Sequence, residues 1–127
     1  MKTRRASASV IVGFAICTVT TTVHLTAEEL FVTVDRFVPH TSTVRANQGD
    51  RVGIFVREKL SQDVADQIAA SAHSPGKVVL FVHGGSVPSV PDYDLPYKDY
   101  SWMAHLAAAG YDTFAMDQSG YGRSPRP

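Results

Sequence analysis

Two short apolar runs, each followed by a glycine-containing turn, constrain the fold of this chain more than any other feature of its sequence. The first run is 78–82, followed by His-Gly-Gly-Ser at 83–86; the second is 113–116, followed by Asp-Gln-Ser-Gly-Tyr-Gly-Arg-Ser at 117–124. A helical pattern at 100–109 separates them. Two strands joined by a helix pair in parallel, because parallel neighbours need a long return connection. Both turns are then expected at the carboxyl edge of the sheet, where α/β proteins place their functional residues.

The connection between the two apolar runs has two parts. Residues 87–97 contain three prolines, and we expect no regular structure there, because proline lacks a backbone N–H group and fixes φ. The helix predicted over 100–109 has Asp99 as its N-cap and Gly110 as its C-terminal stop. Its apolar stripe is predicted to face the core and consists of Trp102, Met103, Leu106 and Ala109.

A strand pair is predicted nearer the N-terminus. Residues 30–38 alternate loosely between apolar and polar, and Pro39 is expected to end that strand, which leaves His40 in a solvated loop. Residues 52–57 alternate in the same way, and the turn-forming residues 47–50 lie between the two runs. We therefore expect an antiparallel hairpin with a long connection.

A helix is predicted over 60–72, with Ser61 and Asp63 in its first turn. Its apolar residues have helical spacing: Leu60, Val64, Ile68 and Ala72. The predicted order is an antiparallel strand pair, this helix, and then a parallel βαβ unit. This order belongs to the α/β class.

Composition limits what the chain can be. Its 127 residues suffice for one modest domain, and 44% hydrophobic with 19% charged residues is typical of a globular protein. A formal net charge of zero gives no reason to expect a nucleic-acid partner. Cys17 is the only cysteine, and no His or carboxylate cluster has metal-ligand spacing, so we expect no metal and no other cofactor.

Residues 1–27 have the pattern of an export signal. Three basic residues open it: Lys2, Arg4 and Arg5. An apolar core at 10–17 follows, and no further charge appears before Glu28. We expect a periplasmic or secreted protein whose domain comprises residues 28–127. The alternative is an uncleaved segment, 6–27, that anchors the chain to a membrane.

The turn at 83–86 is suited to binding a ligand through its backbone. Glycines after a strand let the chain turn sharply and approach a ligand closely, and exposed N–H groups can point at a developing negative oxygen. A tight turn without function is the alternative. The second turn contains Gly-x-Gly, but Pro125 stands where a dinucleotide-binding loop would have its third glycine, which argues against a phosphate site.

Taken together, the two turns resemble the N-terminal half of the α/β-hydrolase fold, over roughly residues 30–127. In that family the loop after the third strand donates one N–H group to the oxyanion hole. The turn after the fourth strand typically reads Asp-x-x-Gly-x-Gly-x-Ser. The residues that carry the resemblance are His83, Gly84 and Gly85 in the first turn and Asp117, Gly120, Gly122 and Ser124 in the second.

The resemblance implies a role for each turn. The backbone N–H of Gly85 would face the oxyanion, with Ser86 as the neighbouring alternative. His83 and Gly84 would be structural, the histidine orienting the loop and not acting as a base. The second turn would brace the site without taking part in bond breaking. Ser119 departs from the family, because many members carry arginine there.

The activity implied by the resemblance is hydrolysis of an ester, amide or peptide by nucleophilic acyl transfer. Prolyl aminopeptidase-like peptidases, epoxide hydrolases and dehalogenases share the scaffold and remain alternatives. No Gly-x-Ser-x-Gly nucleophile sequence occurs in the 127 residues. We therefore expect a fragment truncated before the nucleophile strand, inactive by itself, with 78–82 as an exposed edge. An alternative of another class is a small exported binding module that uses 87–97 for recognition.

Overall fold

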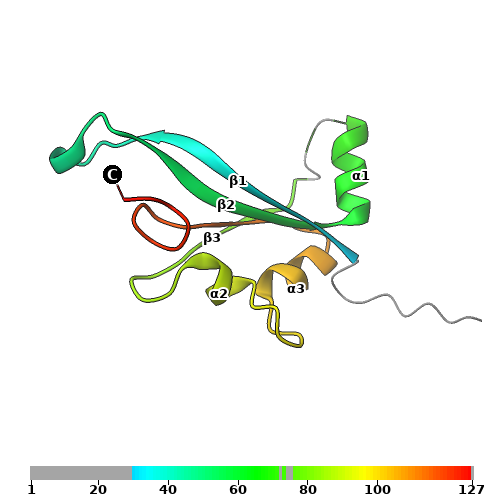
Figure 1. Ribbon diagram of the computed structural model, residues 1–127. Helices are drawn as coiled ribbons and strands as arrows, with labels where there is room; N and C mark the ends of the chain where they lie inside the picture. Colours follow the sequence, from blue (N-terminus) through cyan, green and yellow to red (C-terminus); the bar gives the residue numbers. More distant parts are fainter. Residues whose placement is uncertain (1–29, 72, 74–75, 127) are drawn as a thin grey trace, which may run out of the picture.

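The computed structural model describes residues 30–71, 73 and 76–126, which form one mixed four-stranded sheet with helices (Figure 1). The strands are β1 (Phe31–Thr41), β2 (Arg51–Ser61), β3 (Val78–Val82) and β4 (Asp112–Met116). Their order in the sheet is β1-β2-β4-β3. β1 and β2 are antiparallel, as are β2 and β4, whereas β3 and β4 are parallel. The predicted hairpin and the predicted parallel unit are both confirmed. The predicted export signal at 1–27 lies outside the described residues.

The three α-helices lie on both faces of the sheet, and a short 3-10 helix lies in the β1–β2 connection. They are η2 (Arg45–Asn47), α1 (Gln62–Ser71), α2 (Ser89–Tyr93) and α3 (Trp102–Ala108). Figure 1 shows α2 and α3 together under one face, with α1 on the opposite side at one end. The buried core lies mainly between the sheet and α3, and includes Phe55, Met103, Ala107 and Ala115. None of the described helices has the length and hydrophobicity needed to cross a bilayer.

β1 runs further than predicted. Pro39 does not end it: Pro39 lies opposite Gly53, and His40 lies opposite Val52. β1 is an edge strand, and a proline is tolerated there because one side of the strand has no partner to which its missing N–H would donate. His40 is therefore an exposed strand residue and not part of a loop.

β2 also exceeds its predicted length, at the expense of the following helix. Leu60 lies opposite Val32 in the sheet and is buried, so it belongs to the strand. The helix predicted over 60–72 begins at Gln62 instead. Ser61 acts at its start, where its Oγ accepts a hydrogen bond from the Val64 N–H at 3.3 Å.

The prediction that 87–97 has no regular structure is wrong, because α2 occupies part of it. Pro88 precedes the first helical residue, and Pro91 lies within the first turn. The N–H groups of a first helical turn have no partner within the helix, so proline breaks no helical hydrogen bond there. The sequence rule that proline excludes a helix holds for helix interiors only.

α3 is shorter than the predicted 100–109, and its cap differs. Ser101, not Asp99, is the N-cap: its Oγ accepts from the Ala104 N–H at 2.9 Å. Gly110 follows the helix with φ +83°, a conformation that favours glycine, so the predicted stop is confirmed.

The predicted apolar stripe of α3 is only partly correct. Met103 and Ala107 are fully buried, but Trp102 is 66% exposed and Ala109 is also exposed. Met103 and Ala107 are four positions apart, so they lie on the same face of α3, and this face packs against the sheet. Trp102 lies on the opposite side of the helix, which faces away from the sheet.

β3 is less covered than a buried strand. Val78, Leu80 and Val82 are each about half exposed, whereas Asp112, Thr113 and Ala115 of β4 are buried. Within the described residues β3 ends the sheet, and no helix covers the face to which its even-numbered side chains point. Of the two parallel strands only β4 is buried, and the expected exposed edge is present at β3.

Candidate oxyanion site

The two glycine-containing turns lie side by side at the carboxyl end of β3 and β4. Val82 and Met116 are partners in the sheet, so the turns begin at neighbouring positions. Gln118 joins them twice: its backbone N–H donates to His83 Nε2 at 3.0 Å, and its side-chain amide donates to the His83 carbonyl at 2.8 Å. The sequence placed these turns at one edge of the sheet, and the structure brings them into direct contact.

His83 is buried and makes hydrogen bonds with both ring nitrogens. Because the Gln118 backbone can only donate, Nε2 is an acceptor, and Nδ1 donates to the Gly84 carbonyl at 2.6 Å. The ring also lies 4.9 Å from that of Tyr121, centroid to centroid. With both nitrogens engaged, this side chain holds the turn in place and has no free nitrogen with which to accept a proton from a nucleophile.

The backbone that follows His83 is open. Residues 84–87 are exposed, and within the described part of the chain the N–H groups of Gly85 and Ser86 make no hydrogen bond. A Cβ atom at Gly84 would meet nothing within 4 Å, and one at Gly85 only the Tyr121 hydroxyl at 3.9 Å. Internal packing therefore does not require these glycines, and their small size leaves the backbone accessible to a ligand. Two free N–H groups in one turn can bind an oxygen on which negative charge develops.

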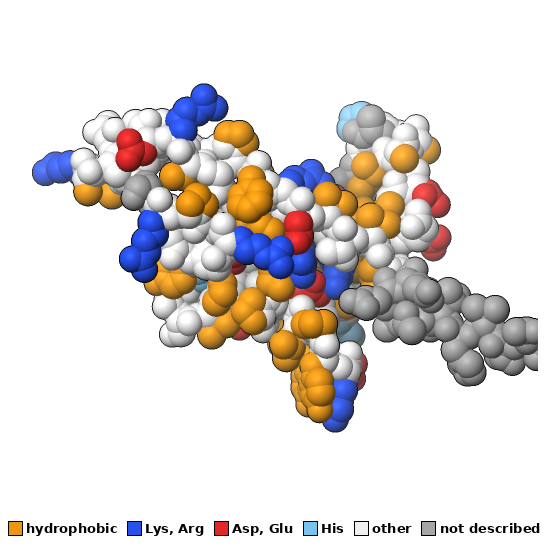
Figure 2. Space-filling model, in the orientation of Figure 1, with side chains coloured by type: hydrophobic (Ala, Val, Ile, Leu, Met, Phe, Trp, Pro, Cys, Tyr) orange, Lys and Arg blue, Asp and Glu red, His pale blue; other side chains and the backbone are white. Residues whose placement is uncertain are grey.

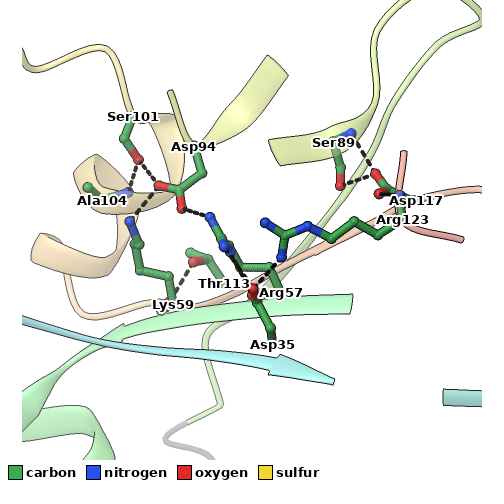
Figure 3. A network of polar contacts seen from close by, with 10 residues as sticks. All are labelled: Asp35, Arg57, Lys59, Ser89, Asp94, Ser101, Ala104, Thr113, Asp117 and Arg123. Atoms are coloured by element: carbon green, nitrogen blue, oxygen red, sulfur yellow. Dashed lines mark hydrogen bonds and ion pairs between the residues drawn. The ribbon is translucent and has the colours of Figure 1, made fainter. Parts of the chain in front are cut away.

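The carboxylate of Asp117 links the second turn to the start of α2. Its Oδ1 accepts from both the backbone N–H and the hydroxyl of Ser89, at 2.8 and 2.7 Å, and its Oδ2 accepts from the Arg123 N–H at 2.8 Å (Figure 3). Asp117 and Ser89 are both buried. The loop that begins at Gly84 is thus fastened at its far end by a buried, fully bonded carboxylate.

The contacts of the second turn with the Asp117 carboxylate and with β2 explain why the turn has the sequence Gly-x-Gly-x-Ser. Gly120 and Gly122 have φ of +85° and +50°, the left-handed region that favours glycine. Ser124 is buried, and its hydroxyl donates to the Asp117 carbonyl at 2.7 Å while it accepts from the Phe55 N–H at 2.8 Å. These residues fix the second turn to the sheet, the bracing role that the resemblance implied.

Sequence reasoning did not identify Ser89. It lies in a proline-rich stretch that was expected to be irregular, and its role depends on Asp117, 28 positions away. One local feature could have indicated a helix start at Ser89: it directly follows Pro88, and helices often begin next to a proline.

A second polar cluster, also unpredicted, joins β1 and β2 to the ends of α2 and α3 (Figure 3). Asp94 is buried and accepts hydrogen bonds from Lys59 Nζ at 2.5 Å, Arg57 Nη1 at 3.1 Å and the Ser101 hydroxyl at 2.6 Å. Arg57 also binds both carboxylate oxygens of Asp35, at 2.7 and 2.8 Å. The members are far apart in the sequence, so no local pattern indicates that they meet.

The pair formed by Asp35 and Arg57 keeps its charges. The hydrogen bonds from Arg57 lower the pKa of Asp35 below its ordinary value, with a further contribution from Arg123, although partial burial opposes the shift. The same contact raises the pKa of Arg57. An ion pair whose members each favour the charged state of the other stabilises the fold and does not exchange protons near neutral pH.

A cleft of about 580 Å³ lies beside the cluster. Its lining includes Arg57, Lys59, Lys98 and Arg123, together with Asp94, but neither Gly85 nor Ser86. The cleft and the open turn are therefore separate features of the molecule. In the part of the chain that the structure describes, no three His, Cys or acidic side chains are grouped so as to hold a metal ion.

The sheet order, the parallel unit and the paired turns are those expected for the N-terminal part of an α/β-hydrolase fold. Residues 77–127, which contain β3, β4 and both turns, match the family model described as the alpha/beta hydrolase fold. The predicted resemblance to that fold family is confirmed over these residues, and β1 and β2 extend the same sheet. No curated protein matches the chain.

Proposed function

We propose that this chain supplies the oxyanion-stabilising part of an exported hydrolase that cleaves an ester, amide or peptide by nucleophilic acyl transfer. The observation that carries the proposal is the pair of unbonded N–H groups at Gly85 and Ser86, at the carboxyl end of β3. When a nucleophile attacks a carbonyl carbon, the oxygen becomes negative, and preorganised N–H donors stabilise it more than they stabilise the substrate.

The surroundings of the turn support preorganisation. The Tyr121 hydroxyl donates to the Gly85 carbonyl at 3.2 Å, which holds that carbonyl toward the second turn. The described peptide bonds are all trans, so the N–H of Ser86 points opposite to the Gly85 carbonyl, away from the second turn. Fixed donors need no reorientation when charge develops, and this saves free energy at the transition state.

The proposal assigns the nucleophile to no residue of this chain. Ser86 is unsuited, because the described residues place no base in hydrogen-bond contact with its hydroxyl and the nearby His83 is fully engaged. The 127 residues contain no Gly-x-Ser-x-Gly. We take the nucleophile strand to lie in a later segment of the same reading frame.

The coding DNA tests this directly. A Gly-x-Ser-x-Gly sequence is expected within about one further βα unit after Pro127, roughly 30 residues. A stop codon directly after Pro127 would instead favour the non-catalytic binding module.

The protein made from the complete reading frame tests the site. It is expected to hydrolyse p-nitrophenyl butyrate, and replacing an oxyanion N–H is expected to lower kcat by about 10²–10³-fold. Gly85→Pro and Ser86→Pro each remove one N–H group, and the larger loss identifies the principal donor. Gly84→Ala controls for folding alone, since a Cβ there meets nothing within 4 Å. If both proline variants fold and keep kcat within threefold of the parent, the turn is not an oxyanion site.

Two further parts of the proposal need their own measurements. Proline p-nitroanilide compared with the ester separates a prolyl aminopeptidase-like peptidase from an esterase.

Export is supported by the basic start and the apolar core at 10–17. N-terminal sequencing of protein from the periplasm and medium is expected to begin near residue 28, whereas an intact N-terminus in the membrane fraction would indicate the anchor.

A further inference from the structure

The connection between α2 and α3 presents large apolar side chains to solvent. We call residues 95–102 the aromatic loop. Four of its side chains are each at least 41% exposed: Leu95, Tyr97, Tyr100 and Trp102. Trp102, at 66%, is the most exposed large hydrophobic side chain among the described residues. In Figure 2 this connection, seen below α2 and α3 in Figure 1, is a hydrophobic projection with a basic side chain at its end.

The projection has internal structure that holds its rings outward. The rings of Tyr97 and Tyr100 are parallel to within 4°, with centroids 5.8 Å apart, and the Tyr100 N–H donates to the Tyr97 carbonyl at 3.2 Å. Lys98 lies between them with φ +51°, and its Nζ is 5.2 Å from the Tyr97 ring centroid. The aromatic side chains are therefore already ordered at the surface, so little conformational entropy is lost when they bind.

A positively charged cleft adjoins the projection. The cleft of about 580 Å³ described above is lined by four cationic side chains and one carboxylate, and Pro96 and Lys98 of the aromatic loop form part of its wall. Asp94, the nearby Asp35 and the exposed Asp99 of the aromatic loop offset three of those charges, which leaves one in excess. An apolar projection next to an excess of positive charge is complementary to a layer whose interior is apolar and whose surface groups are anionic.

We propose that the aromatic loop docks onto a phospholipid surface, with the tyrosines and Trp102 in the head-group region and the basic cleft facing lipid phosphates. Tyrosine and tryptophan concentrate at membrane interfaces because their rings are apolar with a polar tip, and lysine extends its charge to the head groups. Each basic residue near an anionic leaflet adds to the attraction. The hollow beside Trp102, about 270 Å³, is below the usual size of a small-ligand pocket, about 300–1,000 Å³. The proposal is independent of the hydrolase chemistry.

Trp102 is the only tryptophan in the chain, so its fluorescence reports on this site alone. The full chain is titrated with vesicles of phosphatidylcholine, with and without phosphatidylglycerol. We expect a blue shift of the emission with the anionic vesicles, quenching by brominated lipid, and a weaker effect at high salt. Vesicle binding without a change in Trp102 emission would mean attachment through another part of the chain and would overturn the proposal.

Variants separate the two components of the site. Tyr97→Ser/Tyr100→Ser is expected to weaken vesicle binding at least tenfold. Lys98→Gly removes a charge at a position whose φ suits glycine, and a fivefold weakening is expected, confined to anionic vesicles. Val44→Ser is the control, because Val44 is equally exposed, at 63%, but lies at the far end of the hairpin.

Two results would contradict the proposal. One is a double tyrosine variant that binds vesicles as tightly as the parent. The other is a blue shift that occurs without vesicles and disappears on dilution, since this would show that the loop docks onto another protein molecule.

Discussion

The carboxylate of Asp117 occupies the space that a side chain at Gly122 would need. A Cβ atom built at Gly122 would lie closer than 3.0 Å to Asp117 Oδ2 and also to Pro88 Cβ. The glycine thus lets a buried carboxylate reach the N–H groups of Ser89 and Arg123 at once. The second turn and the start of α2 are held together by that one side chain.

Gly122→Ala is expected to destabilise the fold by at least about 2 kcal/mol, because the Cβ displaces the carboxylate and the left-handed backbone disfavours alanine. The free energy of unfolding from urea titration measures this. Gly84→Ala is the control, expected to change it by less than about 0.5 kcal/mol. An unchanged midpoint for Gly122→Ala would contradict the steric explanation.

Ser124→Ala is expected to cost about 2 kcal/mol, since it leaves the buried Phe55 N–H without its acceptor. The same urea titration applies. Ser119→Ala removes only a 3.3 Å bond from an exposed hydroxyl and serves as the control. Equal effects of the two substitutions would show that the link from the turn to β2 contributes nothing.

Asp94→Ala is expected to cost about 3 kcal/mol, because it leaves the mostly buried cations of Arg57 and Lys59 without this partner. Asp92→Ala, at an exposed position of α2 just before Asp94, is expected to be nearly neutral. Thermal melting of the two proteins makes the comparison. Similar melting temperatures would mean that the cluster relaxes around the lost carboxylate.

Acid should weaken the Asp35 contacts. The folded pKa of Asp35 is lower than its ordinary value of 3.8, so its contribution to stability is present above that pH and is lost as the pH falls through the folded pKa. The contribution is expected to be below about 1 kcal/mol, because the side chain is 35% exposed. Urea titrations at about pH 5 and about pH 3 should show a smaller acid-induced loss for Asp35→Asn than for the parent. Equal losses would show that Asp35 is not responsible.

The exposed edge at β3 should promote association. Leu80 is 56% exposed on a strand without charged residues, and an apolar unpaired edge invites pairing with another chain. Leu80→Lys is expected to raise the soluble monomer fraction in size-exclusion chromatography. Val44→Lys adds the same charge at an exposed site away from this edge and is expected to have little effect. An equal gain from both would attribute the effect to net charge alone.

Local rules failed where a partner from elsewhere in the chain decided the outcome. Pro39 interrupts an isolated strand pattern, yet pairing along β2 carries β1 past it. Leu60 fits a helical stripe, but its place opposite Val32 assigns it to a strand. Trp102 fits the same kind of stripe, and only the packing of α3 on the sheet shows that it faces solvent.

The two strands of the parallel unit, the turns after them and the glycines of the second turn could be predicted from the residues alone. Apolar periodicity and the conformational freedom of glycine are properties of short segments, so they can be read without knowing the fold. Three findings needed the folded structure. Asp117 binds Ser89, and Asp94 binds both Arg57 and Lys59. The backbone N–H groups of Gly85 and Ser86 make no hydrogen bond within the described residues. Hydrogen-bond partners and solvent exposure depend on residues distant in the chain, and these become neighbours only when the sheet assembles.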